Sequence, residues 1–304
     1  MKPRVIVILG PTASGKTALS IELAKAIDGE IVSCDSMQIY KDMTIGTAKP
    51  EEKEQCGIKH YLIDFVSPDT RYTVSDYRND AKKAIKEILE KGKMPIVVGG
   101  TGLYADSLIY EIDYPEIAID KLYRQELEKI AQAEGLDRLY KMACNIDEQA
   151  MKKISPNDQK RILRVLEIYH DTGKTKTEME IESRKKEVPY DYHVFAINMP
   201  RDILYNRIDN RVEVMIEKGL IEEVEDLFKK YSNFPTAMQG IGYKEIKQFL
   251  DGKISKEEAI DTIKKESRHY AKRQMTWFRK NKQIVWLDGL KDKKANVNYI
   301  IDNL

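Results

Sequence analysis

The sequence predicts an α/β fold: a parallel, doubly wound sheet flanked by helices and interrupted by an inserted all-helical domain. Short apolar or β-branched runs alternate with longer helical patterns through most of the 304 residues. From about Pro115 to Pro189 there is no convincing strand, and the sequence is charged and helix-favouring. At roughly 150 residues per domain, this length allows two domains or one large domain with an insertion.

The N-terminal segments begin the predicted sheet. Residues 4–9 (RVIVIL) are apolar without alternation, which is typical of a strand buried on both faces of a parallel sheet. The apolar stripe that contains Leu19 and Leu23 predicts a helix over residues 17–27, and residues 30–33 form the next predicted strand. A strand, a helix and a second strand in this order indicate an α/β protein.

Further elements follow along the chain. Short β-branched or apolar runs predict strands at residues 61–65, 95–98, 194–198 and 284–287. Helical patterns cover residues 75–91 and 201–220. We therefore expect residues 1–114 and 190–304 to form the core domain, and residues 115–189 to form the helical insertion.

The composition excludes several classes of protein. With 42% hydrophobic and 33% charged residues, the chain is typical of a globular protein. Its 51 Lys+Arg and 50 Asp+Glu cannot attract a polyanion uniformly, so a nucleic acid would need a local basic patch. The apolar run at residues 5–9 is too short for a signal peptide or a membrane span. No membrane partner is therefore expected. Three cysteines, Cys34, Cys56 and Cys144, form no CxxC motif, which indicates neither a disulfide framework nor a zinc site and favours the reducing cytoplasm.

A phosphate-binding loop is the most specific local motif. Residues 10–17 (GPTASGKT) match GxxxxGK[ST] and lie between a predicted strand and a predicted helix. In such a P-loop the backbone amides surround an oxyanion, Lys16 neutralises phosphate charge, and the Thr17 hydroxyl can bind Mg²⁺. The fold predicted for the core is therefore P-loop NTPase-like. The residues expected to bind a diphosphate are Gly10, Pro11, Thr12, Ala13, Ser14, Gly15, Lys16 and Thr17.

A carboxylate and a glycine-rich turn follow two other predicted strands. Asp35 comes after the strand at 30–33, and residues 99–102 (GGTG) come after the strand at 95–98. Ligands of open α/β sheets bind beyond the carboxyl ends of the strands, so both segments should face the P-loop. Three roles are open to Asp35: general base, magnesium ligand, or N-cap of the residues that follow.

A basic segment lies near the C-terminus. Residues 264–282 contain eight Lys/Arg and one Glu, an imbalance that ordinary solvated helix faces lack. Helical spacing within this segment predicts that Trp277 packs in the core. The cations expected to face outward toward phosphates are Lys272, Arg273 and Arg279.

Six separated motifs together resemble one enzyme family. They are DSMQIY (35–40), GTAKP (46–50), GGTGLY (99–104), SPNDQKRILRVLE (155–167), QGIGYKE (239–245) and YAKRQMTWFR (270–279). Their order and content resemble the tRNA dimethylallyltransferases, also called tRNA isopentenyltransferases. The resemblance covers essentially the whole chain. The departures are small, with Val165 in place of the usual Ala and Tyr77 in place of the usual Phe.

The resemblance implies a reaction and a cofactor. The family transfers the dimethylallyl group of dimethylallyl diphosphate to the exocyclic N6 amine of the adenosine next to the tRNA anticodon on its 3′ side, and diphosphate is released. By resemblance, the P-loop holds the diphosphate leaving group together with Mg²⁺ bound by Thr17. Arg207 and Arg211, four residues apart on one predicted helix, are candidates for additional diphosphate contacts. The alternative is that both pair with Asp209 and Glu213 on the surface.

The resemblance also implies an RNA site for the tRNA anticodon stem-loop. Asp35 is the candidate base, Thr101 would orient it or the leaving oxygen, and Gln38 can offer both donor and acceptor to a flipped adenine. A monomer is expected. The candidate tRNA contacts are Asp35, Ser36, Met37, Gln38, Thr101, Arg124, Gln159, Lys160, Arg161, Ile162, Leu163, Arg164, Lys272, Arg273 and Arg279.

Two other functions compete with this interpretation. In a small-molecule kinase, the P-loop would hold ATP, Asp35 would deprotonate an acceptor hydroxyl, and Arg161 and Arg164 would form a lid. A kinase, however, does not need the basic C-terminal segment or the DSMQ segment. A P-loop module that only binds RNA would leave the convergence of Asp35 and Thr101 on the crevice without a purpose.

Overall fold

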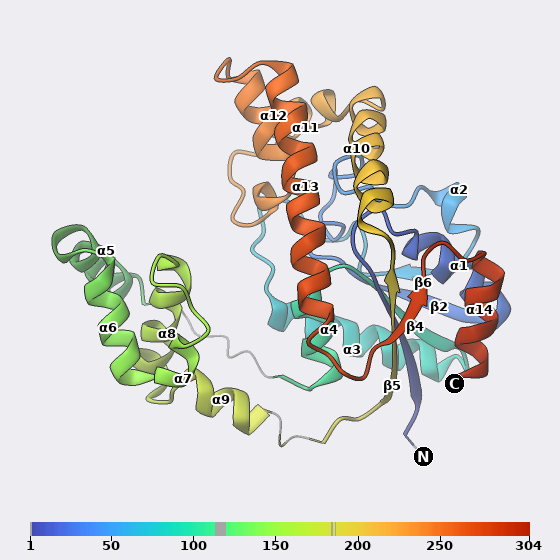
Figure 1. Ribbon diagram of the computed structural model, residues 1–304, viewed down its shortest axis with the longest axis horizontal. Coiled ribbons are helices and arrows are strands. Elements are labelled where there is room, and N and C mark those ends of the chain that lie inside the picture. Colours follow the sequence, from blue (N-terminus) through green and yellow to red (C-terminus); the bar gives the residue numbers. More distant parts are fainter. Residues whose placement is uncertain (1, 113–119, 184, 186) are drawn as a thin grey trace. The chain divides into compact units, whose positions relative to one another are not determined.

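The computed structural model describes residues 2–112, 120–183, 185 and 187–304 (Figure 1). The chain divides into two compact units, of which the first comprises Met1–Ile109 and Pro189–Leu304 and the second Tyr110–Val188. The expected start of the insertion, Pro115, lies outside the described residues. Each unit is built around its own buried apolar side chains.

The first unit contains a six-stranded sheet in the order β3-β2-β4-β1-β5-β6. All neighbouring strands are parallel, which confirms the predicted sheet. The strands are β1 (Arg4–Leu9), β2 (Gly29–Cys34), β3 (His60–Tyr61), β4 (Met94–Gly99), β5 (Asp191–Asn198) and β6 (Val285–Asp288). β3 is shorter than predicted because Leu62 and Asp64 have positive φ angles of 58° and 57°, which extended strands do not allow.

Helices cover this sheet and extend beyond it. They are α1 (Lys16–Ala26), α2 (Glu52–Gln55), α3 (Val74–Glu90), α4 (Gly102–Ile109), α10 (Arg201–Glu217), α11 (Leu220–Lys230), α12 (Tyr243–Leu250), α13 (Lys256–Phe278) and α14 (Lys293–Asp302), with a 3₁₀ turn at Ala237–Gln239. Apolar side chains of α1 and α14 pack against Ile6, Ile8 and Ile96 of the sheet. β1 is buried along most of its length, as expected for a strand covered on both faces.

Local signals explain where two of the longer helices begin and end. Ser255 caps α13 with a capping box, in which Glu258 accepts a hydrogen bond from the Ser255 amide. The single helix predicted over 201–220 is divided into α10 and α11. Gly219, with φ of 99°, ends the first helix in the left-handed conformation that glycine adopts readily.

The second unit is helical throughout its described residues. It consists of α5 (Lys121–Glu134), α6 (Leu136–Ile146), α7 (Glu148–Met151), α8 (Gln159–Thr172) and α9 (Lys176–Ser183). The buried carboxylate of Asp147 accepts hydrogen bonds from the amides of Ala150 and Thr177, which joins α7 to α9. Within the described part of the chain, no helix is both long and apolar enough to cross a membrane.

Replacing Tyr110–Val188 with a short loop should leave the first unit folded. The physical reason is that the buried cluster of the second unit, which includes Leu127, Leu139 and Leu166, is supplied by that unit's own helices. Thermal unfolding of the shortened protein should remain cooperative, and it should still bind a diphosphate ester. Loss of cooperative unfolding would show that the first unit depends on the second.

Candidate functional site

Three strand ends meet at one edge of the sheet. In the register, Leu9 of β1 and Cys34 of β2 both lie beside Gly99, the last residue of β4. An added Cβ on Gly99 would lie 1.9 Å from the carbonyl oxygen of Cys34, so this close approach requires glycine. The loops that follow these strands therefore begin side by side, which places Asp35 and Thr101 next to the P-loop.

The P-loop turns sharply into α1. Ala13 and Gly15 have positive φ angles of 62° and 88°, and the Ser14 amide donates to the carbonyl of Pro11. Gly15 at the N-cap supplies no side-chain hydrogen bond to α1. The first amides of α1 therefore remain available to an anion, and the helix dipole favours negative charge at this end.

A buried amide side chain joins the P-loop to the turn after β4. Gln274 of α13 accepts a hydrogen bond from the Thr12 amide (3.0 Å) and donates one to the carbonyl of Gly100 (2.9 Å). The sequence carried no signal for this bridge. Gln274 fixes the distance between two of the three segments that form the site.

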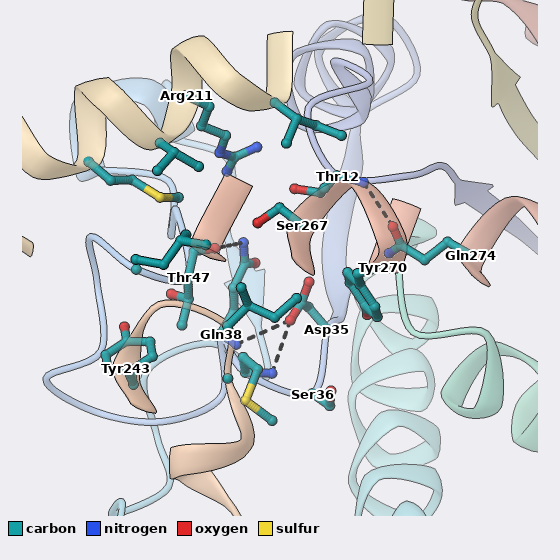
Figure 2. A pocket seen from close by; sticks show the side chains of 18 of the residues that line it. Thr12, Asp35, Ser36, Gln38, Thr47, Arg211, Tyr243, Ser267, Tyr270 and Gln274 are labelled. Carbon is teal, nitrogen blue, oxygen red and sulfur yellow. Dashed lines mark hydrogen bonds between the residues drawn. The ribbon is translucent and has the colours of Figure 1, made fainter. Parts of the chain in front are cut away.

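A cavity of about 330 Å³ lies in front of these segments (Figure 2). Its walls come from the P-loop, from the segment after β2, and from helices α10, α12 and α13. The polar residues that line it include Thr12, Lys16, Thr17, Asp35, Ser36, Gln38, Arg211, Tyr243, Ser267, Tyr270, Arg273 and Gln274, and Met37 contributes a thioether. A second cavity, of about 620 Å³, shares Lys16, Thr17 and Arg211 with the first and reaches Ala13, Ser14 and Gly15.

Two cations and one carboxylate dominate the electrostatics of the cavity. Burial lowers the pKa of Lys16 to about 8, the negative charge of Asp35 limits this shift, and the positive charge of Arg211 contributes to it. Burial likewise lowers the pKa of Arg211, again opposed by Asp35. Two partly desolvated cations beside one carboxylate favour an anionic ligand that can compensate the excess positive charge.

Asp35 uses one carboxylate oxygen to hold its own loop. Its Oδ1 accepts hydrogen bonds from the amides of Met37 (3.0 Å) and Gln38 (3.4 Å), as in an Asx turn. Among the described residues, none donates a hydrogen bond to Oδ2. The N-cap role considered for Asp35 therefore uses only Oδ1. Oδ2 accepts no hydrogen bond from the described residues and can interact with a ligand.

Thr101 supports this segment from behind the cavity. Its Oγ1 accepts a hydrogen bond from the Ser36 amide (3.0 Å), and its own amide donates to the carbonyl of Cys34 (3.1 Å). Thr101 is absent from the residues that line the cavity. Thr101 therefore contacts the segment that carries Asp35 and does not line the cavity itself.

The side-chain amide of Gln38 is held in one orientation. Its Nε2 donates to the carbonyls of Thr47 (3.1 Å) and Ala48 (3.2 Å). Both Nε2 hydrogens are occupied, so only the acceptor Oε1 remains for a ligand. The prediction that Gln38 offers both donor and acceptor is corrected accordingly.

The two arginines predicted to contact the diphosphate, Arg207 and Arg211, have different positions on α10. Arg211 lines both cavities, whereas Arg207 is exposed and lines neither. The neighbouring carboxylates Asp209 and Glu213 instead form ion pairs with α13 (see below). Of these two candidates for diphosphate contacts, only Arg211 lies at the cavities.

On α13, the outward cations have the predicted exposure. Lys272, Arg273 and Arg279 are exposed, and Arg273 also borders the cavity. Trp277, predicted to lie in the core, is 37% exposed, so that prediction is wrong. Its indole ring covers Gly102, and its Nε1 donates to Asp106 (2.8 Å), because an indole N–H needs a polar partner.

Two predicted RNA contacts of the helical unit are buried. Ile162 and Leu163 are 0% and 2% exposed and belong to the apolar core of the unit, so the prediction of direct contact is wrong for both. They lie on the inward face of α8, which adjacent sequence positions alone did not distinguish. The candidates that remain accessible are Arg124, Gln159, Lys160, Arg161 and Arg164.

The accessible arginines of this unit already have acidic partners. Arg124 and Arg164 share the buried carboxylate of Glu167, at 3.1 and 3.6 Å, and Arg161 lies 3.4 Å from Asp158. Arg124 also lies 3.2 Å from the carboxylate of Glu128, so the positive charge of these arginines is balanced by acidic neighbours of the same unit.

The fold and the site define a P-loop α/β protein whose anion-binding loop opens into a polar cavity. The IPP transferase family model matches residues 38–281. The tRNA dimethylallyltransferase of Acetivibrio thermocellus is 49% identical over 301 residues, covering 99% of this chain and 96% of that protein. That of Bacillus cereus strain G9842 is 43% identical over 295 residues, covering 97% of this chain and 93% of that protein.

Solved structures give the same result. The full-length tRNA isopentenylpyrophosphate transferase of Bacillus halodurans is 40% identical with a TM-score of 0.74, covering 99% of this chain and 95% of that chain. A eukaryotic dimethylallyltransferase acting on tRNA is 30% identical with a TM-score of 0.81, and the match covers 99% of this chain and 80% of that chain. The chain belongs to the tRNA dimethylallyltransferases, enzymes also called tRNA isopentenyltransferases. This membership does not favour the kinase alternative.

The pKa of Lys16 predicts how diphosphate binding changes with pH. Lys16 loses its charge as the pH rises through about 8, and a bound anion favours the charged form. Affinity for an alkyl diphosphate should therefore fall above pH 8, by at most about tenfold per pH unit for one proton. Calorimetric titration between pH 7 and 9.5 measures this change.

Lys16→Ala is the matched control for this measurement. It should bind more weakly at every pH and lose the decline above pH 8. If the variant keeps the same pH dependence, another group is responsible.

Proposed function

We propose that this protein transfers the dimethylallyl group from dimethylallyl diphosphate to the N6 amine of the adenosine on the 3′ side of the tRNA anticodon. One observation carries the proposal: Lys16, Arg211 and Asp35 line the same cavity. The cations suit a diphosphate, and the carboxylate suits a nucleophile that must lose a proton. A prenyl transfer to an amine needs both.

The diphosphate side of the site comprises the P-loop and Arg211. Amides at the start of α1, together with Lys16 and Arg211, would stabilise the charge that grows on the leaving oxygen as the allylic C–O bond breaks. This stabilisation increases from ground state to transition state, so it accelerates the reaction.

The residues present fit a magnesium ion whose coordination shell is completed by the phosphates of dimethylallyl diphosphate. The Thr17 hydroxyl is an oxygen ligand of the kind that Mg²⁺ prefers, and it lines both cavities. Among the described residues, no group of three or more His, Cys, Asp or Glu could hold a metal, so donor phosphates and water would supply most ligands. When bound there, Mg²⁺ would neutralise diphosphate charge.

The amine side of the site comprises Asp35 and Gln38. An exocyclic amine has two hydrogens, and the site offers two acceptors, the unoccupied Oδ2 of Asp35 and Oε1 of Gln38. As the N6–C bond forms and the C–O bond breaks, Asp35 accepts one amine proton and diphosphate departs with the electron pair of the C–O bond. Thr101 acts by holding the segment that carries Asp35.

The tRNA side of the proposal uses both units. In the anticodon stem-loop, the target base must leave its stack to enter a cavity. The RNA would be contacted by the exposed cations of α13 and by five residues of the helical unit: Arg124, Gln159, Lys160, Arg161 and Arg164.

The three cysteines are free thiols, which fits the reducing cytoplasm. We propose that the protein acts as a monomer.

Incubating the protein with unmodified tRNA and dimethylallyl diphosphate labelled in the alkyl group tests the proposal. Label should appear in the RNA, at an adenosine beside the anticodon, and it should depend on Mg²⁺. ATP-dependent phosphorylation of a small metabolite in the absence of RNA would instead support a kinase.

Within this assay, Asp35→Asn should lower the single-turnover rate by about 10²- to 10⁴-fold, the range typical of a general base. The amide is nearly isosteric and keeps an acceptor for the Met37 and Gln38 amides, so affinity for tRNA and donor should be retained. Transfer at the wild-type rate would leave Asp35 only its local capping role.

A further inference from the structure

The positive charge of α13 is neutralised in one part of the helix and left free in another. Lys264 and Arg268 form ion pairs with Glu213 and Asp209 of α10. Further along, Lys272 and Arg279 form no ion pair with any described residue, and neither does Arg201 at the start of α10. The excess charge is therefore concentrated between the beginning of α10 and the end of α13.

These three cations surround a cleft of about 200 Å³ between α10 and α13. Its floor is apolar, and the guanidinium of Arg201 lies 5.0 Å from the centre of the Tyr205 ring. The lining residues that matter for binding are Arg201, Leu204, Tyr205, Lys272, Met275 and Arg279. Buried Leu204 and Ala271 belong to an apolar cluster against which Ala13 of the P-loop packs.

We infer that this α10–α13 cleft binds one unpaired nucleotide of the RNA, other than the one that reacts. The cations match a phosphate, and the apolar floor with Tyr205 matches the flat face of a base, since unpaired bases are commonly stacked on aromatic or guanidinium planes. The cleft volume of about 200 Å³ suits a single base. This inference rests on the proposed function, because it assumes that the protein binds tRNA.

Two variants separate the base from the phosphate. Thr276→Trp fills the cleft from an exposed position of α13 without removing charge. It should weaken tRNA binding about fivefold or more while leaving the salt dependence unchanged. Arg201→Ala should weaken binding and reduce the slope of log affinity against log salt by about 0.7. Lys265→Ala, an exposed cation of α13 outside the cleft, is the matched control.

The readouts are tRNA affinity at four salt concentrations, the melting temperature, and affinity for dimethylallyl diphosphate, which should be unchanged in all three variants. Unchanged tRNA affinity in Thr276→Trp would overturn the cleft as a base site and leave a phosphate-binding surface. An equal loss in Lys265→Ala and Arg201→Ala would overturn it in favour of diffuse attraction. Failure of the unaltered protein to bind tRNA would contradict the proposed function itself.

A second, independent network surrounds Glu223 of α11. Its carboxylate accepts hydrogen bonds from three consecutive amides, those of Thr44 (2.9 Å), Ile45 (2.6 Å) and Gly46 (3.1 Å). It also accepts one from the hydroxyl of Tyr243 (2.8 Å). Four donors on one carboxylate hold the loop after Met43 in a single conformation.

This loop in turn orients Gln38. Thr47 and Ala48, directly after the amides bound by Glu223, supply the two carbonyls that accept from Nε2 of Gln38. The Tyr243 ring packs against Gly46, where an added Cβ would lie 2.6 Å from the ring. Glu223 and Tyr243 thus hold the loop that sets the direction of the Gln38 amide.

We propose that Glu223 is a positioning residue that makes Gln38 select adenine. With Nε2 held by two carbonyls, Gln38 presents only an acceptor, which attracts the adenine amine and repels the O6 acceptor of guanine. A released Gln38 could rotate and donate to O6. This proposal also rests on the proposed function, and specifically on Gln38 as the base contact.

A double-mutant cycle tests this coupling. Glu223→Gln should reduce, severalfold, the preference for binding tRNA with adenosine rather than guanosine at the target position. In a Gln38→Ala background the same change should have little further effect, because both act through one side chain. Tyr243→Phe should act in the same direction but less. Glu225→Gln, an exposed glutamate of α11, is the control.

Melting temperatures show whether each variant is folded, and Tyr243→Phe tests the coupling if Glu223→Gln does not fold. Independent effects of Glu223→Gln and Gln38→Ala on discrimination would overturn the positioning role. If Gln38→Ala itself leaves discrimination unchanged while transfer continues, the proposal is overturned but the proposed reaction is not.

Discussion

The hydrogen bonds of a single buried amide hold the site together. Gln274 binds the Thr12 amide with its oxygen and the Gly100 carbonyl with its nitrogen, so α13 connects the loop after β1 to the turn after β4. The carbonyl of Gly100 is buried, so leaving it without this partner would be costly. The same helix carries Tyr270 and Arg273 into the cavity. A long helix at the end of the sequence thereby fixes a loop at its beginning.

The distribution of charge follows from the packing of two helices. Acidic residues of α10 pair with Lys264 and Arg268 of α13, whereas Lys272 and Arg279 form no ion pair within the described part of the chain. A chain with a formal net charge of +1 therefore acquires a local positive surface. Such a surface can attract a polyanion without making the whole protein basic, and its effect is strongest at low salt.

A P-loop determines that a phosphate ligand binds, but not what happens to it. Here the residues in front of the loop are Asp35 and Gln38. One oxygen of Asp35 accepts no hydrogen bond from the residues that the structure describes, and both amide hydrogens of Gln38 are donated to backbone carbonyls. Both present acceptors to the cavity. This arrangement suits an amine nucleophile, whereas Lys16 and Arg211 suit a leaving diphosphate. The reaction class thus depends on residues contributed by the second strand and its following loop, not on the phosphate-binding motif alone.

The sequence by itself determined the parallel sheet, the P-loop, and the placement of Asp35 beside it, because apolar runs mark buried strands and ligands bind beyond their carboxyl ends. Its motifs also indicated the family. It did not distinguish Arg211 from Arg207, reveal the burial of Ile162 and Leu163, or indicate the exposure of Trp277. These features, like the bonds of Gln274 and Glu223, join residues far apart in the chain. Only the tertiary structure decided them, because which side of a helix is covered, and which donor meets which acceptor, depends on how distant segments pack.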